Sequence, residues 1–275
     1  MMISDFVKSP RWFWMFVFAA IFFAVAYVVI WFFDEVTPGN FWGLTFGTIA
    51  TILFVAVALY GIRRRTMNTS SRLKFGSANT WLQIHLYGGT LFLLLMFLHT
   101  AFSLPQGAFN WWLWLLSVWV VLSGLVGVVL QKLIPQLLSS ALTIEIRTDR
   151  IDELVKELRG QAEAEVANSP AAIRDYYQRT IAAEMAKPTL RPAFFKDITG
   201  GIQTKVRQMD YLKQFLSDDD KRRLDNLELI YRSKLECDAH YTLQKPLRLW
   251  LIAHLPVSIV LFTLVLIHLF IVFYY

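Results

Sequence analysis

The 275-residue chain has one cysteine, Cys237, and few charged residues. One cysteine excludes an internal disulfide framework, a zinc site built from several thiolates, an iron–sulfur cluster held by this chain alone, and the C-x-x-C-H attachment of c-type haem. Charged residues make up 17% of the chain and hydrophobic residues 56%, and the mean hydropathy is +0.44. This balance is too apolar for a soluble globular domain and predicts a membrane protein.

Five stretches are long and apolar enough to cross a membrane, which takes about 20 mostly apolar residues per helix. They are Arg11–Phe33, Phe41–Ile62, Trp81–Leu104, Phe109–Ile134 and Leu247–Tyr275. The first run is too long for a signal peptide and ends in bulky aromatic residues rather than small ones. We therefore expect an all-α membrane protein with five transmembrane helices.

The positions of these helices divide the chain into three parts. Residues 1–134 carry the first four helices, residues 135–246 form an insertion, and residues 247–275 form the fifth helix, which completes the bundle. The stretch from Gln131 to Pro246 contains 19 Lys or Arg and 18 Asp or Glu, so the insertion is nearly neutral and well solvated. We expect it to be a mostly helical cytoplasmic domain that docks a redox partner, with simple structural packing as the alternative.

Several signals place helices within the insertion. Asp149 is a candidate cap for a helix through Arg159, and Ser169-Pro170 is a second candidate start, with Pro188 as the stop. The run from Ser217 to Asp220 resembles a capping box that opens a long helix to Lys245, after which Pro246 would restart the chain as the fifth membrane helix. The alternating stretch Leu142–Arg147 is a candidate short strand.

Charge in the short loops predicts the orientation. The turn at 34–40 holds two acids and no base, whereas the loop at 63–80 holds five bases and no acid. The positive-inside rule places that second loop, the amino terminus and the insertion in the cytoplasm and the carboxyl terminus in the periplasm. We expect a multi-pass protein of the bacterial cytoplasmic membrane. The net charge of +6 belongs mainly to the membrane edge, so nucleic acid is not an expected partner.

Four of the five histidines lie in the expected membrane helices and form two pairs of equal spacing. His85 and His99 lie on the third helix and His254 and His268 on the fifth, each pair at positions i and i+14. Fourteen residues cover ~21 Å and four turns of a supercoiled helix, so each pair projects from one seam at two depths. Because both helices begin at the cytoplasmic side, His85 should face His254 near the inner surface and His99 should face His268 near the outer one.

Two facing imidazoles at each depth suit the two axial positions of a six-coordinate haem iron. We expect two b-type haems, with the inner iron held by His85 and His254 and the outer iron by His99 and His268. Zinc suits the pattern less well, because two histidines leave a tetrahedral site half built. The alternative is a non-redox membrane scaffold or transporter, in which the histidines serve packing, proton relay or substrate contact.

Glycines and arginines near these depths are further candidates. Gly47 and Gly61 on the second helix have the same i, i+14 spacing, and they either admit a flat porphyrin or serve ordinary helix packing. Arg63, Arg72 and Arg248 lie near the inner depth and are candidate donors to haem propionates, although topology alone would also explain them.

His240 precedes His254 by the same i, i+14 spacing and raises the question of a third haem. The matching position relative to the third helix is Ser71, which cannot ligate iron, and Pro246 interrupts the helix. We expect a polar surface histidine instead. A role near an inner quinone or partner site, with Asp238 as its neighbour, is the alternative.

The chain resembles the di-haem cytochrome b group, above all the haem-bearing helical bundle of cytochrome b in quinol-oxidising bc and b6f complexes. The resemblance rests on four spaced histidines and two spaced glycines, His85, His99, His254, His268, Gly47 and Gly61. It implies a low-potential and a high-potential haem that carry electrons across the bilayer to or from quinone. The Pro-Glu-Trp-Tyr element of that family's quinol-oxidation site is absent, and the insertion has no counterpart there.

A weaker resemblance is to the membrane domain of ferric reductases and NADPH oxidases, whose paired histidines also lie on the third and fifth helices. From these features we expect a di-haem electron-transfer subunit of an oxidoreductase complex in a respiratory chain. It would relay electrons between quinone or a redox partner and an acceptor on the opposite face. The expected cofactors are two haems b and a quinone. The expected partners are membrane lipid and other redox subunits, such as a c-type cytochrome or an iron–sulfur protein.

Overall fold

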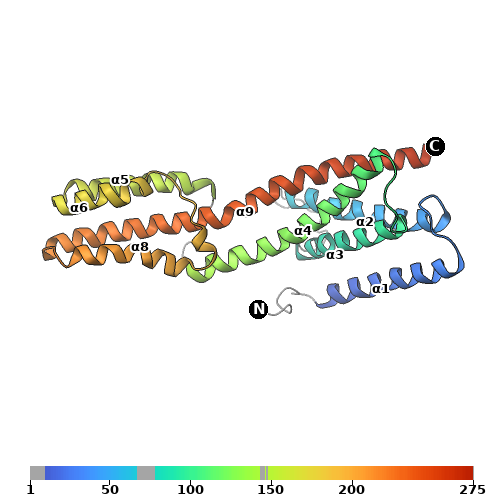
Figure 1. Cartoon of the computed structure of the whole chain (residues 1–275), viewed down its shortest axis with the longest axis horizontal. Coiled ribbons are helices and arrows are strands. Elements are labelled where there is room, and N and C mark those ends of the chain that lie inside the picture. The colour runs from blue at the N-terminus through green and yellow to red at the C-terminus, as the bar shows by residue number, and fades with distance from the viewer. Residues whose placement is uncertain (1–9, 67–77, 143–145, 147, 275) are drawn as a thin grey trace. The chain divides into compact units, whose positions relative to one another are not determined.

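The computed structural model describes residues 10–66, 78–142, 146 and 148–274, and in these residues it contains helices and no strand (Figure 1). The helices are α1 (Pro10–Phe33), α2 (Phe41–Thr66), α3 (Ala78–His99), α4 (Ala108–Ala141), α5 (Ile151–Ala167), α6 (Ala171–Tyr176), α7 (Ala182–Met185), α8 (Ile198–Lys213) and α9 (Asp218–Tyr274), with the short turns η2 (Thr148–Arg150), η3 (Tyr177–Ile181) and η4 (Pro192–Phe195). Helices α1 to α4 and α9 are long and apolar enough to cross a membrane. The predicted all-α membrane fold with five spanning helices is therefore confirmed.

The chain forms two compact units whose boundaries fall inside α4 and α9. The membrane unit comprises the described residues up to Val126 and from Ile252 onward, and the insertion unit is Gly127–Leu251. The sequence placed the insertion at 135–246, so the insertion unit takes in slightly more of both helices.

The core of the membrane unit comes from α2, α3, α4 and α9. Its buried residues are Phe46, Ala50, Phe54, Phe92, Leu95, Leu98, Val121 and Leu261. The positions on α2 and on α3 recur every three or four residues, which is the spacing of one helix face. Helix α1 has no buried residue and packs on α3 (Figure 1). The four core helices therefore carry the interior in which a cofactor would lie.

Helix α3 ends at His99, five residues before the predicted end at Leu104. Ala101 and Phe102 follow with φ angles of 50° and 57°, in the left-handed region that ends a helix. The amide of Phe102 donates to the carbonyl of Phe97 at 2.9 Å, and the two rings stack 5.8 Å apart. This closed turn satisfies the helix terminus and places His99 in the last turn of α3.

Two prolines do not end helices where the sequence predicted. Helix α4 continues through Pro135 to Ala141, and α9 is continuous through Pro246, so the predicted end at Ile134 and restart at Pro246 are wrong. Proline within a helix costs about 3 kcal/mol. Ile134, next to Pro135, and Leu243, one turn before Pro246, are buried in the insertion core, and burial of one such side chain contributes about 1.5–3 kcal/mol.

Helices α5 to α9 bury one continuous core in the insertion unit. On α8 the buried residues are Ile198, Ile202, Val206 and Met209, and on α9 they are Leu224, Leu227, Tyr231, Leu235, Ala239 and Leu243. This spacing of three and four gives each helix one apolar face. The predicted helical character of the insertion follows from these faces.

The predicted helix caps of the insertion meet different outcomes. Asp149 lies in η2 and Arg150 precedes α5, which extends past Arg159 to Ala167. The Ser169 hydroxyl donates to the backbone carbonyl of Glu165 and does not cap α6. The N-cap residue of α6 is Pro170, which makes no side-chain hydrogen bond. The helical run that follows ends at Met185, before the expected stop at Pro188.

The predicted start of α9 after Ser217 is confirmed, but only one of the two bonds that define a capping box is seen there. The amide of Asp220 donates to the Ser217 hydroxyl, which donates to the Asp220 carboxylate at 2.6 Å. Of the candidate strand Leu142–Arg147, residues 143–145 and 147 lie outside the described residues. Leu142 and Ile146 are not in a strand.

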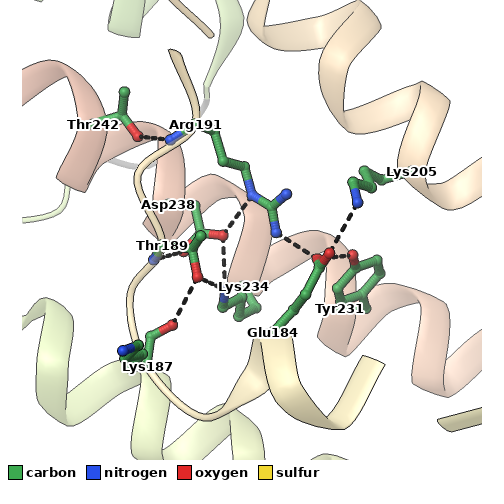
Figure 2. Close-up of polar contacts among 9 residues, drawn as sticks. All are labelled: Glu184, Lys187, Thr189, Arg191, Lys205, Tyr231, Lys234, Asp238 and Thr242. Atoms are coloured by element: carbon green, nitrogen blue, oxygen red, sulfur yellow. Dashed lines mark hydrogen bonds and ion pairs between the residues drawn. The ribbon is translucent and has the colours of Figure 1, made fainter. Parts of the chain in front are cut away.

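A polar network joins the segment after α7 to α9 (Figure 2). Asp238 and Lys234, both with fully buried side chains, pair at 2.7 Å, and Asp238 also accepts from Nε of Arg191 at 2.8 Å. The backbone amide of Thr189 donates to Asp238 at 2.9 Å. Arg191 also forms an ion pair with Glu184, which lies in the last turn of α7. These bonds hold the 186–191 connection against α9.

Candidate functional site

His99 on α3 and His268 on α9 face each other in the membrane unit. Their ring centroids are 6.5 Å apart and the ring planes are inclined by 73°. His99 and His268 are each the second histidine of their helix, and their contact is the one expected if α3 and α9 run parallel. The structure therefore brings together two imidazoles that are far apart in the chain.

The Nδ1 atom of His99 lies 2.8 Å from the backbone carbonyl of Gly43 on α2. A carbonyl can only accept, so Nδ1 must carry the proton and donate it. In the neutral imidazole Nε2 is then the nitrogen without a proton, which is the form that binds a metal. The ring of His99 is thus fixed in orientation and in tautomer.

Gly47 makes room for the His99 ring. A Cβ atom at Gly47 would lie 2.7 Å from Nδ1 of His99 and 3.0 Å from its Cε1. The sequence offered Gly47 as a position that admits a porphyrin, but the atoms that would meet its Cβ belong to the imidazole. At Gly61, by contrast, nothing among the described residues lies within 4 Å of a Cβ.

His268 has an aromatic neighbour on α4. The ring of Phe109 stacks on its imidazole, with centroids 6.4 Å apart and planes inclined by 28°. Among the described residues, none makes a hydrogen bond to the His268 ring. Packing alone therefore orients His268.

His85 on α3 is held in the same way as His99. Its Nδ1 lies 3.1 Å from the carbonyl of Val57 on α2, and the ring of Tyr60 packs 4.9 Å from its centroid. A Cβ at Gly88 would lie 2.9 Å from a methyl group of Val57, so Gly88 allows the close approach of α2 and α3. Nδ1 of His85 again carries the proton, which leaves Nε2 of the neutral ring unprotonated.

His254 on α9 is held by a side chain of α4. Its Nδ1 lies 2.8 Å from Oγ of Ser123, and that hydroxyl donates to the carbonyl of Val120 at 3.1 Å. Gly124 lies in ordinary contact, because a Cβ there would be 3.6 Å from Cε1 of His254. Three of the four histidines therefore have a hydrogen-bonding partner at Nδ1.

These partners repeat the spacing of the histidines. Gly43 and Val57 on α2 stand at positions i and i+14, and so do Phe109 and Ser123 on α4. The sequence reasoning identified only Gly47 and Gly61 and missed these four contacts. A search of the second and fourth helices for further pairs of this spacing would have found Ser123, since a hydroxyl on an apolar helix is conspicuous. The carbonyls of Gly43 and Val57 carry no side-chain signal.

The structure does not test the three candidate arginines. Arg63 lies in α2 with its side chain outside the described residues, and Arg72 lies outside them altogether. Arg248 is exposed on the part of α9 that belongs to the insertion unit. Their predicted role as propionate donors stays a prediction.

His240 is buried, with 1% of its surface exposed, so the expectation of a surface histidine is wrong. Its Nδ1 lies 3.2 Å from the side-chain amide of Gln244, which also donates to the carbonyl of Ile146 at 2.9 Å. No sequence signal indicates this burial, because it depends on the packing of α9 in the insertion unit. Its predicted neighbour Asp238 bonds to Lys234 and Arg191.

No family model, curated protein or solved structure matches this chain. Within the part of the chain that the structure describes, no group of three or more His, Cys, Asp or Glu side chains could hold a metal by itself. A tetrapyrrole supplies four nitrogen ligands to a metal in one plane, which would leave two positions for imidazoles.

The separation of His99 and His268 fits two axial ligands of one such metal. Imidazole nitrogens bind metals at about 2.0 Å, which places the centroids of two opposed rings ~6.3 Å apart. The distance also suits an edge-to-face contact of two free rings. Metal-binding histidines commonly have a hydrogen-bonding partner at the nitrogen that does not bind the metal, and His85, His99 and His254 have such a partner at Nδ1.

Proposed function

We propose that this membrane protein is a di-haem b-type cytochrome subunit that relays electrons across the membrane. The observation that carries the proposal is the 6.5 Å separation of the His99 and His268 rings on two different helices. His99 and His268 would hold one haem, and His85 and His254 the second. Haem b supplies a one-electron couple at its iron, and the protein sets the ligands and surroundings.

The hydrogen bonds at Nδ1 support this assignment. The carbonyl of Gly43, the carbonyl of Val57 and the hydroxyl of Ser123 lie within hydrogen-bonding distance of Nδ1 of His99, His85 and His254, respectively. Each such histidine therefore offers Nε2 in one fixed direction, which lowers the cost of arranging the ligands when the cofactor binds.

Along the helices, the core of the membrane unit lies between the depth of His85 and His254 and the depth of His99 and His268. Phe54 contacts the rings of Phe92 and Phe262, with centroids 4.9 Å and 6.1 Å away. Phe92 lies midway in sequence between His85 and His99, and Phe262 lies near the midpoint of His254 and His268. These apolar side chains exclude water from the region between the two pairs of facing histidines, which lie ~21 Å apart along the helices.

The loop charges support the orientation that belongs to this proposal. For a protein of the bacterial cytoplasmic membrane, five bases in the loop at 63–80 favour a cytoplasmic amino terminus and insertion and a periplasmic carboxyl terminus. Quinone or a redox subunit would exchange electrons at one face and a second acceptor at the other. The insertion unit, with its nearly balanced charge, would dock one of these partners.

A reduced-minus-oxidised absorbance spectrum of the purified protein tests the proposal, together with haem determination per chain. We expect a b-type α band and two haems per chain. His240→Ala is the matched control, because His240 belongs to the insertion unit and should leave both haems in place. Protein that is folded and helical but carries no haem after expression with haem supply would rule the proposal out and favour the non-redox scaffold or transporter.

A further inference from the structure

The Ser123 hydroxyl lies between a backbone carbonyl of its own helix and the His254 ring. A serine in a membrane helix satisfies its hydroxyl proton on a carbonyl of the preceding turn, and Ser123 donates to Val120 at 3.1 Å. The hydroxyl has one proton and two lone pairs, so toward His254 its oxygen accepts. Nδ1 of His254 is therefore the donor over the 2.8 Å contact.

At the His99–His268 pair, the equivalent position of α4 carries no hydroxyl group. Phe109 precedes Ser123 on α4 by the same i, i+14 spacing and presents an aromatic ring to His268. The two α3 histidines, in contrast, have the same kind of partner, a backbone carbonyl of α2. The difference between the His85–His254 pair and the His99–His268 pair thus arises where α4 meets α9.

A hydrogen bond from Nδ1 increases the basicity of the ligating nitrogen. A more basic axial ligand stabilises the oxidised iron over the reduced iron, and second-shell hydrogen bonds are one of the means by which a protein tunes a haem potential. The chain Nδ1–H to Oγ–H to carbonyl strengthens this effect because successive hydrogen bonds polarise one another.

Resting on the proposed haem function, we propose that Ser123 is a positioning residue for His254 that lowers the reduction potential of the His85–His254 haem. Phe109 leaves the His99–His268 haem without that contribution. The asymmetry is built into a single helix by the choice of serine at one depth and phenylalanine at the other.

A spectroelectrochemical titration of the purified full-length chain tests this inference, with Ser123→Ala, Ser123→Thr and Ser117→Ala compared with the wild type. Loss of the hydroxyl in Ser123→Ala should raise the midpoint potential of one haem, changing its reduced-to-oxidised ratio at fixed potential roughly fivefold, the effect of one hydrogen bond. The other haem should not move. Ser123→Thr keeps a hydroxyl and should titrate like the wild type.

Ser117 is the matched control, because it is buried on the same helix and no described histidine bonds to it. Its alanine variant should leave both potentials unchanged. If Ser123→Ala loses one haem that Ser123→Thr retains, the hydroxyl is still shown to hold His254. Unchanged potentials in Ser123→Ala, or equal shifts in the alanine and threonine variants, would overturn the inference while leaving two haems in place. A wild type without haem would instead overturn the proposed function itself.

Discussion

Gly47 on α2 and His99 on α3 are in such close contact that a methyl group on Gly47 would lie 2.7 Å from Nδ1 of the imidazole. The same Nδ1 donates to Gly43 at 2.8 Å, so the ring cannot move aside without losing that bond. Gly47→Ala should therefore displace His99 and remove one of the two proposed haems. Haem content per chain and the amplitude of the α band measure this loss.

Gly160→Ala is the control for that experiment. Gly160 is an exposed glycine within α5 of the insertion unit, and nothing described lies within 4 Å of its Cβ position. Alanine there should keep both haems and stabilise α5 by about 0.5–1 kcal/mol through its higher helix propensity. Equal haem loss in the two variants, or none in Gly47→Ala, would show that the Gly47 contact does not matter for ligation.

The pair of Lys234 and Asp238 has no exposed side-chain surface, so its two charges depend on each other. Asp238→Ala leaves Lys234 and Arg191 without their shared carboxylate and should destabilise the insertion unit by about 3–5 kcal/mol. Thermal or urea unfolding followed by circular dichroism measures the change.

Asp219→Ala provides the comparison, since Asp219 pairs with Arg222 at 3.0 Å with both side chains mostly exposed. Its cost should be about 0–1 kcal/mol. The double variant Lys234→Met with Asp238→Leu should recover part of the loss, because it removes both buried charges. Similar costs for Asp238→Ala and Asp219→Ala would contradict the assignment of a buried network.

Glu184 makes the stability of the insertion unit depend on acid pH. Burial raises its pKa, but hydrogen bonds from Tyr231, Lys205 and Arg191 outweigh burial and hold the pKa at about 2, below its usual 4.5. A carboxylate with a lowered pKa stabilises the fold fully above its unfolded pKa and loses that contribution as the pH falls toward the folded pKa.

Stability should therefore decline as the pH falls from about 4.5 to about 2. Glu184→Gln should flatten this part of the pH profile and lower stability at neutral pH. Urea unfolding across this range measures both effects. An unchanged slope in Glu184→Gln would assign the acid sensitivity to other carboxylates.

Cys237 should be unreactive in the folded chain. Only 2% of its surface is exposed, and burial, together with the charges of Asp238 and Glu236, raises the pKa of its thiol to about 11. Because the thiolate is the nucleophile, alkylation at pH 7 should be slow until the insertion unit unfolds. Mass spectrometry after brief iodoacetamide treatment, with and without denaturant, measures this, and rapid labelling of the native protein would contradict the burial.

The fold class could be predicted from the sequence because five long apolar runs are local signals. The ends of α4 and α9 could not, since Ile134 and Leu243, near Pro135 and Pro246, are buried against residues distant in the chain. The burial of His240 could not be predicted either, because it also depends on packing against residues distant in the chain. The carbonyl partners of His85 and His99 leave no trace in side-chain identity.

Ser123 and Phe109 represent an intermediate case. Their i, i+14 spacing on the fourth helix was visible, but their contacts with His254 and His268 depend on how α4 packs against α9. Periodicity could have suggested that these positions face the site. The different chemistry of the two contacts required the structure.

The most direct test of the central claim is the haem content and α-band spectrum of four single variants compared with the wild type. We predict two haems in the wild type. His99→Ala and His268→Ala should lose the same spectral component, and His85→Ala and His254→Ala should lose the other. A folded wild type without haem, or variants in which His99 and His268 affect different components, would contradict the pairing of the four histidines.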